Sequence, residues 1–466
     1  STYVKPSKSI PKTISVLTGI SDDDVKHAPS IEKVKKKIQS FIGEKVIVGH
    51  NVLFDLSFLS ACGIEFNNES CDTLHLSYMI EPSAPDYTLT GLANYLDIPQ
   101  EKSHRALADS VTCMQLLKKL FVTYLALPIS TAAQIAALHQ RGDTPLNKIL
   151  TRLLAIKLEQ KETGFNILQG DTKSVSKDSQ LCRSKDHDPP PKTVDEIFAK
   201  PDRFSVVIPD YENREGQMEM ARMVEDSLKA SSNLIIEAGT GIGKSMAYLM
   251  PSIIHGLKTK KRVVVSTNTI NLQDQLMEKD IPAALSILGI NGHFDNKFSF
   301  HVLKGSRNYL CKRRLETQVN RAQIDADQAI FFSKILVWLS STDTGDKSEI
   351  NLNRRGHDLL WSRINGDSSD YCGIRHGNCF LRKARDLASE SDLLVVNHSL
   401  LMANIKSGMT IIPDHDCLIL DEAHHLEKEA TNAFGFEITS ELIQEITDRM
   451  SGGDSILDTA TRLIKN

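Results

Sequence analysis

Residues 234–249, LIIEAGTGIGKSMAYL, hold the pattern from which the fold of this chain is best predicted. The apolar run at 234–236 predicts a buried strand, and the glycines that follow predict a turn. Lys244 and Ser245 then open a segment with the pattern of a helix. This order is that of a phosphate-binding loop of the Walker A type, with Ala238 in the first glycine place. An ordinary strand–turn–helix connection is the alternative.

The residue types in this loop suit the binding of ATP with Mg²⁺. Glycines let backbone N–H groups converge on phosphate oxygens, and the start of a helix adds partial positive charge. We expect Lys244 to reach the β- and γ-phosphates and the Ser245 hydroxyl to hold Mg²⁺. The candidate ATP site is therefore the whole loop: Ala238, Gly239, Thr240, Gly241, Ile242, Gly243, Lys244 and Ser245.

Composition limits the class of protein. The 466 residues suffice for about three domains of ~150 residues. With a net charge of −4, nucleic-acid binding cannot be argued from overall charge and needs a local basic patch. No apolar run approaches the ~20 residues of a membrane span, so we expect no membrane partner. Eight cysteines without a tight framework favour a reducing cytoplasm.

A second motif completes the expected ATP site. The stretches 262–267, RVVVST, and 417–420, CLIL, predict buried strands, and Asp-Glu-Ala-His follows the second of them. Acidic residues at the tip of a buried strand fit a Walker B site. There Asp421 would hold Mg²⁺ through water and Glu422 would polarise the attacking water. A charged strand end is the alternative.

Two polar residues upstream of the loop are further candidates for ATP binding. Arg214 and Gln217 lie a short distance before the phosphate-binding loop. The amide of Gln217 can both donate and accept hydrogen bonds, as the edge of adenine requires. From spacing alone, a polar helix face explains both residues equally well.

The N-terminal region carries a different set of candidates. Residues 45–59 predict a strand followed by a helix, with Asp55 among apolar residues. Residues 102–120 predict an amphipathic helix, with His104 just before it and Asp109 in its early turns. Two carboxylates and a histidine suggest phosphodiester hydrolysis assisted by Mg²⁺ or Mn²⁺, in which the histidine deprotonates a water. Helix caps or solvated side chains are the alternative.

The order of motifs over about 110 residues resembles the DnaQ-like (DEDDh) 3′–5′ exonucleases. The motifs are LTGI and HAP within 14–29, His-Asn with Phe-Asp at 50–55, Cys-Asp-Thr at 71–73, Tyr-x-Leu at 87–89, and His104 with Asp109. The resemblance implies Asp55 and Asp109 as metal ligands and His104 as general base. It also implies an Asp-x-Glu motif before LTGI. Residues 1–13 contain neither acid, so we expect an incomplete nuclease site.

The C-terminal part resembles the DinG family, bacterial relatives of the XPD helicases of superfamily 2. The resemblance rests on an ordered set of motifs: Glu237-Ala-Gly-Thr-Gly, Ser266-Thr-Asn-Thr, Gly305-Ser-Arg-Asn-Tyr-Leu-Cys, Ala384-Arg385, Val396-Asn-His and Asp421-Glu-Ala-His. Some members carry a DnaQ-like domain in front. The resemblance implies ATP-driven movement, typically 5′ to 3′, on single-stranded DNA and on DNA with single-stranded tails, in the bacterial cytoplasm. It names no protein partner.

The family inserts accessory segments between the Gly305 and Ala384 motifs, and many members ligate an iron–sulfur cluster there with four cysteines. Here only Cys311, Cys372 and Cys379 lie in that insertion, although His376 could substitute for the fourth. We therefore expect no cluster. Basic residues interleave with aromatic ones, a pattern that suits single-stranded DNA, although a solvated face is the alternative. The aromatic residues are Tyr309, Trp361, Tyr371 and Phe380.

The predicted class is α/β: an RNase H-like exonuclease fold lacking its first strands, then a RecA-like P-loop motor lobe with a helical insertion. The predicted domains are an exonuclease domain over 1–125, a helical connector and linker over 126–205, and the motor lobe over 206–466 with its insertion at about 310–390. Motifs of a second motor lobe are absent, and we expect both ends of the chain to be truncated.

The sequence is compatible with three functions. The first is an ATP-dependent DNA helicase or translocase with a fused 3′–5′ exonuclease, acting in DNA repair or replication. The second is an exonuclease in which the motor lobe is an ATP-dependent clamp that does not unwind DNA. The third is DNA binding without catalysis, because both catalytic centres lack parts that their families use.

Overall fold

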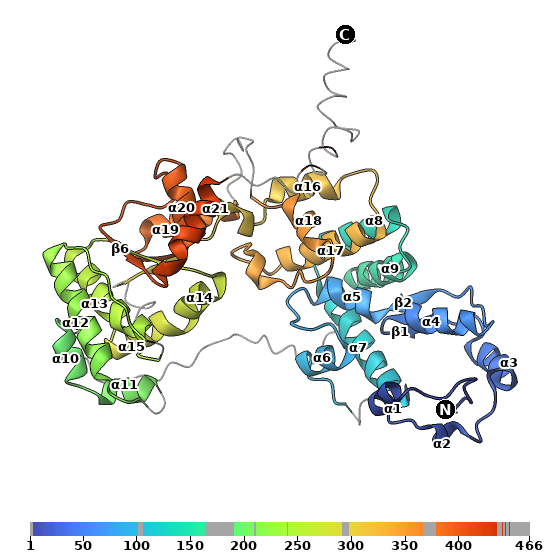
Figure 1. Ribbon diagram of the computed structural model, residues 1–466. Helices are drawn as coiled ribbons and strands as arrows, with labels where there is room; N and C mark the ends of the chain where they lie inside the picture. The colour runs from blue at the N-terminus through green and yellow to red at the C-terminus, as the bar shows by residue number, and fades with distance from the viewer. Residues whose placement is uncertain are drawn as a thin grey trace, which may run out of the picture. The chain divides into compact units, whose positions relative to one another are not determined.

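The computed structural model describes residues 3–100, 106–163, 191–208, 211–239, 241–290, 298–366 and 379–435, with the single positions 440, 443 and 447 (Figure 1). The chain forms two compact units. Unit 1 combines residues 1–181 with 306–383, and unit 2 combines 182–305 with 384–466. The segment 306–383 therefore packs with the N-terminal part, although both of its neighbours in the sequence belong to unit 2.

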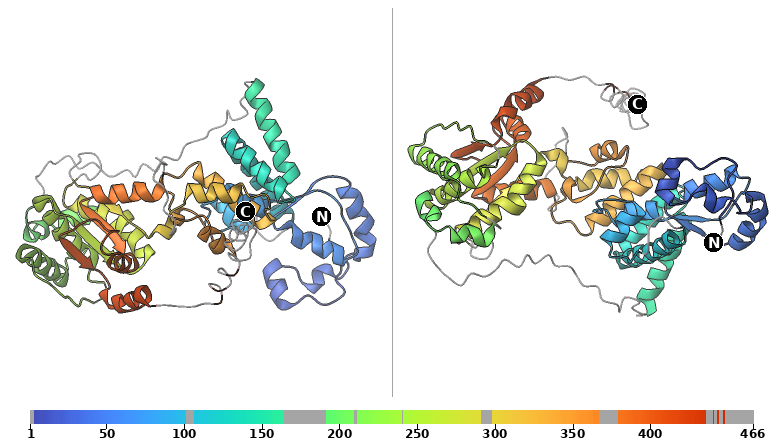
Figure 2. Two further views of the ribbon diagram at one scale, coloured as in Figure 1. Left: turned by 90° about the horizontal axis from the view of Figure 1, so that it is seen from above. Right: turned by 60° about the horizontal axis from the view of Figure 1, so that its bottom comes forward.

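Unit 2 is built on a four-stranded parallel sheet of order β4-β5-β3-β6. The central strand β3 (Val263–Thr267) is buried at all five positions and pairs with β5 (Leu393–Asn397) and β6 (Cys417–Leu420). A β-branched run that is buried throughout is typical of a parallel strand covered on both faces. Figure 2 shows this sheet enclosed by helices. β4 (Phe300–Val302) forms one edge.

The helices of unit 2 connect these parallel strands. α13 (Lys244–Thr259) carries an almost continuous buried run from Met246 to Ile254 and packs on β3 and α12. The remaining elements are α10 (Val194–Phe198), α11 (Asp202–Val207), α12 (Glu215–Ala230), α14 (Ile270–Gln275), η1 (Leu276–Asp280), α15 (Ile281–Ile287), α19 (Phe380–Glu390), α20 (His398–Lys406), η4 (Ala423–His425) and α21 (Leu426–Phe434).

The strands expected at 262–267 and 417–420 are confirmed as β3 and β6, but the strand expected at 234–236 is not formed. Ile235 is 97% exposed, and this run makes no ladder with any strand of the described residues. An apolar run becomes a strand only where neighbouring strands satisfy its backbone groups. β6 is the other edge of the sheet and alternates between half-buried and exposed residues, so it is less buried than predicted.

Unit 1 contains a pair of parallel strands, β1 (Ile47–Gly49) and β2 (Ser70–Asp72). α4 (Val52–Ala61) follows β1 and α5 (Thr73–Ile80) follows β2. The strand and helix predicted within 45–59 are therefore confirmed. The other elements before the linker are α1 (Lys12–Thr18), α2 (Asp22–Val25), α3 (Ile31–Ile42), α6 (Leu89–Tyr95), α7 (Ala106–Ala126), α8 (Ile129–Arg141) and α9 (Asn147–Thr163).

The core of unit 1 is centred on α17 (Ala326–Leu339), which lies in the segment 306–383. This helix is buried continuously from Ala329 to Trp338 and packs against α5 and α8, while the rings of Phe331 and Trp338 contact those of His357 and Trp361. Each such side chain contributes roughly 1.5–3 kcal/mol when buried. The segment also contains η2 (Ser306–Asn308), α16 (Lys312–Val319), η3 (Lys347–Glu349) and α18 (His357–Ser362).

These contacts divide the chain differently from the predicted boundaries. α8 and α9, expected in a separate connector, bury Ile135, Leu138 and Leu150 in the same core as α17. The residues expected as an insertion of the motor lobe join that core too. A helix that is hydrophobic all round must be covered on every side, and the helices that cover α17 come from the N-terminal part. α8 ends at Arg141 and α9 begins at Asn147, so the connector starts as a pair of helices.

Both units combine helices with parallel strands, so the predicted α/β class is confirmed. Within the described ranges, no single helix is long and apolar enough to cross a membrane. The bent pair α7–α8 passes that test by length and composition, and its residues Leu116, Leu120, Ile135 and Leu138 lie in the core of unit 1.

Candidate nucleotide and nuclease sites

The phosphate-binding loop ends in two glycines that adopt backbone angles favourable only for glycine. Gly241 and Gly243 have φ values of 83° and 85°. Gly243 is the N-cap residue of α13, so the helix begins at Lys244 as predicted. Its first N–H groups and the positive end of its dipole lie where an anion can be bound. Thr240 lies outside the described residues.

Lys244 contacts the acidic motif at the end of β6. Its Nζ lies 2.9 Å from Oε1 of Glu422, and both side chains are about one-third exposed. The hydrogen bond from Lys244 holds the pKa of Glu422 below its usual value. Glu422 has a φ of 55°, a left-handed backbone conformation that turns the chain out of β6. The structure therefore brings the Walker A lysine and the predicted catalytic glutamate together.

The carboxylate of Asp421, the first residue of the acidic motif, accepts a hydrogen bond from a side chain of α13. The Tyr248 hydroxyl, one turn along α13 from Lys244, donates to Asp421 Oδ2 at 3.2 Å and is also a hydrogen-bond partner of Ser245. Burial raises the pKa of Asp421 despite this bond. Burial and the Asp421 charge also raise the pKa of Tyr248 well above its usual value. Tyr248 thus links the two predicted Mg²⁺ ligands of unit 2, and sequence reasoning had given it no role.

His398, at the start of α20, contacts both β3 and the residue that follows β6. Its Nδ1 lies 2.7 Å from the Ser266 hydroxyl on β3, and its Nε2 lies 2.9 Å from the backbone oxygen of Asp421. The ring is fully buried at the start of α20, and burial lowers its pKa. The backbone N–H of Asp421 donates to the Ser266 oxygen at 2.8 Å. Through these bonds His398 holds the backbone of the acidic motif in place relative to β3.

Gln217 and Arg214 contact the backbone of the phosphate-binding loop. Gln217 Nε2 donates to the Gly243 oxygen at 3.0 Å, and its Oε1 accepts a hydrogen bond from Tyr211 at 3.1 Å. Arg214 donates to the oxygen of Gly241. Both candidates lie at the loop, as expected for residues of a nucleotide site. Each end of the Gln217 amide makes one of these bonds, so one N–H and one oxygen lone pair are left that could pair with adenine.

In unit 1, Asp55 lies on α4 and Asp109 in the first turns of α7. Burial and the nearby Asp72 raise the pKa of Asp55. Burial, with smaller contributions from the Asp72 and Asp55 charges, raises the pKa of Cys113, which lies one turn beyond Asp109 on α7. Asp55 is therefore near the part of α7 that carries Cys113. No cluster of three or more His, Cys, Asp or Glu able to hold a metal occurs among the described residues. His104 lies outside them.

Asp72 is a structural residue that the sequence had shown only as part of a motif. It is 5% exposed, and its oxygens accept hydrogen bonds from the backbone N–H groups of Asn51, Val52 and Leu74 at 2.9–3.1 Å. One carboxylate thus caps the starts of both α4 and α5. An aspartate directly between a strand and a helix is the signal that could have identified it. Through α4, Asp72 sets the position of Asp55.

The expectation that aromatic residues of the insertion stack on DNA bases is wrong for those that the structure describes. Tyr309, Trp361 and Phe380 are at most 7% exposed, and Trp361 and Phe380 belong to the core of unit 1. The Lys312 ammonium group also lies 4.4 Å from the centre of the Phe380 ring. Rings buried to this extent offer no face on which a base could stack. Cys311 and Cys379 are free thiols. Tyr371, Cys372 and His376 lie outside the described residues.

Comparison with known proteins agrees with the two sets of motifs. Residues 1–117 match the Exonuclease family RNase_T, and residues 217–290 match the DEAD/DEAH box helicase family. The protein named 3′-5′ exonuclease DinG of Bacillus subtilis is 30% identical over 446 residues, which are 94% of this chain and 47% of that protein. Proteins of the same name from Staphylococcus haemolyticus and Staphylococcus epidermidis are 27% and 28% identical over the same shares.

The chain thus spans about half the length of the curated relatives it matches. The similarity extends over both units and covers 94% of the chain. The predicted resemblance, an exonuclease-type domain followed by a DEAD/DEAH helicase domain as in DinG proteins, is confirmed.

Proposed function

We propose that this chain, in which an exonuclease-type domain precedes a DEAD/DEAH-type helicase domain, is part of an ATP-hydrolysing DNA helicase or translocase with a fused 3′–5′ exonuclease. The motor moves on single-stranded DNA from 5′ to 3′, starting from single-stranded tails. It acts in the bacterial cytoplasm in DNA repair or replication, without a membrane partner. Mg²⁺ serves the motor, and Mg²⁺ or Mn²⁺ serves the nuclease.

One observation carries the ATPase proposal. Lys244, Ser245, Asp421 and Glu422 come from two distant parts of the sequence and meet at the start of α13 and the end of β6. A lysine for the phosphates, two oxygen ligands for Mg²⁺ and a carboxylate to polarise water are the groups that phosphoryl transfer to water requires. Carboxyl ends of parallel strands are also where such folds bind ligands.

ATP turnover, measured with and without single-stranded DNA, tests this proposal. Lys244→Ala removes the positive charge that stabilises the phosphates, so turnover should fall at least hundredfold. Lys279→Ala is the matched control, because Lys279 is exposed on η1. Equal turnover in the two variants contradicts the assignment.

A second candidate function is a 3′–5′ exonuclease in which ATP regulates cleavage without unwinding. It is favoured by the name of the relatives, 3′-5′ exonuclease DinG, which refers to the nuclease activity alone. Asp55 and Asp109 would hold the divalent ions, and His104 would deprotonate the attacking water. The closeness of Asp55 to α7 supports this arrangement.

Two DNA substrates separate these functions. A strand labelled at its 5′ end reports shortening from the 3′ end, and a forked duplex whose strands carry 3′-terminal phosphorothioates reports unwinding. The first function predicts ATP-dependent unwinding by an Asp109→Ala variant that no longer cuts. The second predicts cutting by the wild-type chain and no unwinding by either protein. Binding without either reaction would support a DNA-binding protein that is not an enzyme.

A further inference from the structure

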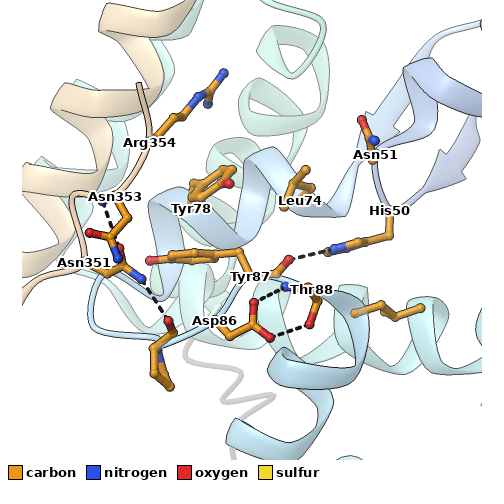
Figure 3. A pocket seen from close by; sticks show the side chains of 12 residues that line it. His50, Asn51, Leu74, Tyr78, Asp86, Tyr87, Thr88, Asn351, Asn353 and Arg354 are labelled. Atoms are coloured by element: carbon orange, nitrogen blue, oxygen red, sulfur yellow. Dashed lines mark hydrogen bonds between the residues drawn. The ribbon is translucent and has the colours of Figure 1, made fainter. Parts of the chain in front are cut away.

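A cavity of about 540 Å³ in unit 1 is not used by either proposed reaction centre (Figure 3). One wall comes from the exonuclease-type domain, including Asn51, Tyr78 and Tyr87. The other wall comes from residues 351–354. These lie in the segment 306–383, which packs in unit 1 although the residues before and after it in the sequence belong to unit 2. The volume lies in the range of pockets that hold small ligands.

The wall from residues 351–354 is firmly attached to the exonuclease-type domain. Asn351 N donates to the Pro82 oxygen at 2.9 Å, and its side-chain amide donates to the oxygens of Ala84 and Pro85 at 2.9 and 3.2 Å. Its Oδ1 accepts a hydrogen bond from Asn353 N at 3.0 Å. The pocket is therefore a built feature of unit 1 with a defined shape.

Several side chains of the lining keep hydrogen-bonding groups available. Asn51, Tyr78 and Asn353 line the cavity. Within the part of the chain that the structure describes, no hydrogen bond is made by the side-chain amides of Asn51 and Asn353 or by the Tyr78 hydroxyl. Figure 3 shows Asn51 and Asn353 on opposite sides of it. By contrast, His50 is engaged, with its ring nitrogens 3.0 Å from Thr73 Oγ1 and 2.9 Å from the Tyr87 oxygen. Amides and a phenol are the groups that pair with the edge of a nucleobase.

The same wall carries the guanidinium group of Arg354, and Asp86 also lines the cavity. Arg354 lies with Cζ 5.3 Å from the centre of the Tyr78 ring and pairs with the exposed Asp327 at 2.7 Å. Its Nη1 is buried without a hydrogen-bond partner. Behind it, Lys334 is 1% exposed and donates to the Tyr87 hydroxyl at 2.9 Å. A phosphate oxygen next to Arg354 would accept a hydrogen bond from the guanidinium nitrogen that Asp327 leaves unpaired.

The pocket lies close to the candidate nuclease centre. Asn51 is the N-cap residue of α4, and Asp55 lies one turn further along the same helix. This lining residue and the candidate metal ligand therefore both lie at the start of the same helix. A strand whose 3′ end reaches Asp55 would therefore have a neighbouring nucleotide within reach of the pocket.

We propose that this pocket is a nucleotide subsite for single-stranded DNA in the exonuclease-type domain, completed by residues 351–354. Asn51, Asn353 and the Tyr78 hydroxyl contact the base, and Arg354 contacts the phosphate. This inference rests on the proposed nuclease function and adds the residues that hold its substrate. The segment 306–383 then contributes directly to DNA binding by the nuclease, through its polar loop and not through its buried aromatic rings.

The test is a scan of single abasic positions along an oligonucleotide with a free 3′ end. Affinity is measured by fluorescence anisotropy on the full chain in EDTA, so that nothing is cut. In the wild-type chain, loss of one base near the 3′ end should weaken binding about tenfold, as the loss of a held base does elsewhere. The variants are Asn353→Ala and the double variant Asn353→Ala/Tyr78→Phe. In these variants, removing the base at the same position should weaken binding threefold or less.

Asn320→Ala is the matched control, because Asn320 is an exposed asparagine at the end of α16 in the same unit. In this variant, removing the base should still weaken binding about tenfold, as in the wild-type chain. If the double variant is unfolded by circular dichroism, Asn353→Ala alone decides, since Asn353 is exposed and its backbone is held by Asn351. An equal penalty in Asn353→Ala and Asn320→Ala overturns the proposal.

A nucleotide can reach the pocket within a strand or as the free product of cleavage. Calorimetry with deoxyadenosine monophosphate and thymidine monophosphate distinguishes the two sources. Binding of free nucleotide, lost in Asn353→Ala, together with a flat abasic scan overturns the assignment to the strand. If no abasic position weakens binding and free nucleotide does not bind, the subsite is overturned altogether. Nuclease and ATPase activities are measured separately. If the chain is active but no single abasic position weakens binding, the subsite is refuted and the proposed function is not.

Discussion

Lys244 and Glu422 form an ion pair across the candidate ATP site, with Nζ and Oε1 2.9 Å apart. In the proposed reaction these two groups have different tasks: the lysine binds phosphate oxygens and the glutamate polarises water. Their pairing therefore belongs to the state before ATP binds. The γ-phosphate must replace Glu422 as the partner of Lys244, and this exchange frees the glutamate for its own task.

Glu422→Gln tests that exchange. Removing the charge takes away a competitor for Lys244, and the pair is worth about 1 kcal/mol because both side chains are partly exposed. Affinity for a fluorescent ATP analogue should rise a few-fold, while phosphate release should fall at least hundredfold. Glu278→Gln, an exposed glutamate on η1, is the control. Weaker binding in Glu422→Gln would show that Glu422 does not compete with the phosphate.

Tyr248→Phe tests whether the Tyr248 hydroxyl orients the metal ligands. The hydroxyl donates to Asp421 Oδ2, and this bond lowers the pKa of that carboxyl. Loss of such a bond to a charged group costs about 1.5 kcal/mol. The Mg²⁺ concentration for half-maximal turnover should therefore increase about tenfold, with an unchanged circular dichroism spectrum. A Mg²⁺ titration identical to that of the wild-type chain would count against a positioning role for Tyr248.

Gly243→Ala should disable the phosphate-binding loop. A Cβ atom at this position would overlap Gln217 Nε2, and the φ of 85° is unfavourable for alanine. Strain of this kind costs on the order of 1–3 kcal/mol, so ATP affinity should fall at least tenfold. Gly216→Ala is the control, because its nearest contact would be Ile242 Cγ2 at 3.8 Å. If both variants bind ATP like the wild-type chain, the loop tolerates a conformation other than the one described.

The parts of the site that could be predicted from sequence are those set by local patterns. Glycines before Lys244, and an apolar strand before Asp421, place functional groups through backbone geometry that a few residues determine. The loop, β3 and β6 are accordingly found where they were expected. The order of motifs also identified both families, because each motif has a separate position along the chain.

What could not be predicted depends on contacts between distant segments. The apolar pattern of α17 predicts a buried helix but does not say that α5 and α8 cover it, so the segment 306–383 was assigned to the wrong neighbours. The same holds for residues 234–236, whose apolar pattern does not show whether a strand lies beside them. Tyr248 and His398 act through single hydrogen bonds to Asp421, and sequence spacing carries no signal for such bonds.

Iron content tests the expectation that no iron–sulfur cluster is bound. The insertion holds Cys311, Cys372 and Cys379, whereas a cubane cluster normally takes four thiolates. Protein purified without oxygen should contain less than about 0.1 iron per chain and no broad visible absorption. Near-stoichiometric iron and sulfide would mean that His376 or a more distant cysteine completes the ligand set.

Lys334 should make the stability of unit 1 depend on pH above neutrality. Its ammonium group is buried between Tyr78 and Tyr87, and burial lowers its pKa to about 7. An unfolded lysine titrates near its ordinary 10.5, so between these values unfolding takes up a proton. The free energy of unfolding must then rise with pH from about 7 upward, whereas below pH 7 both states are protonated and this group adds no slope.

Lys334→Met isolates this contribution. The variant loses the hydrogen bonds to Asn351 and Tyr87, which shifts its stability by a similar amount at every pH. It also loses the titrating group, so the rise on the order of 2–3 kcal/mol between pH 7 and 9.5 should disappear. Urea denaturation of both proteins at several pH values measures the difference, and Lys118→Met, an exposed lysine on α7, should keep the wild-type slope. Parallel pH profiles for wild type and Lys334→Met would show that Lys334 keeps its proton in the folded chain, stabilised by the tyrosine rings on which it lies.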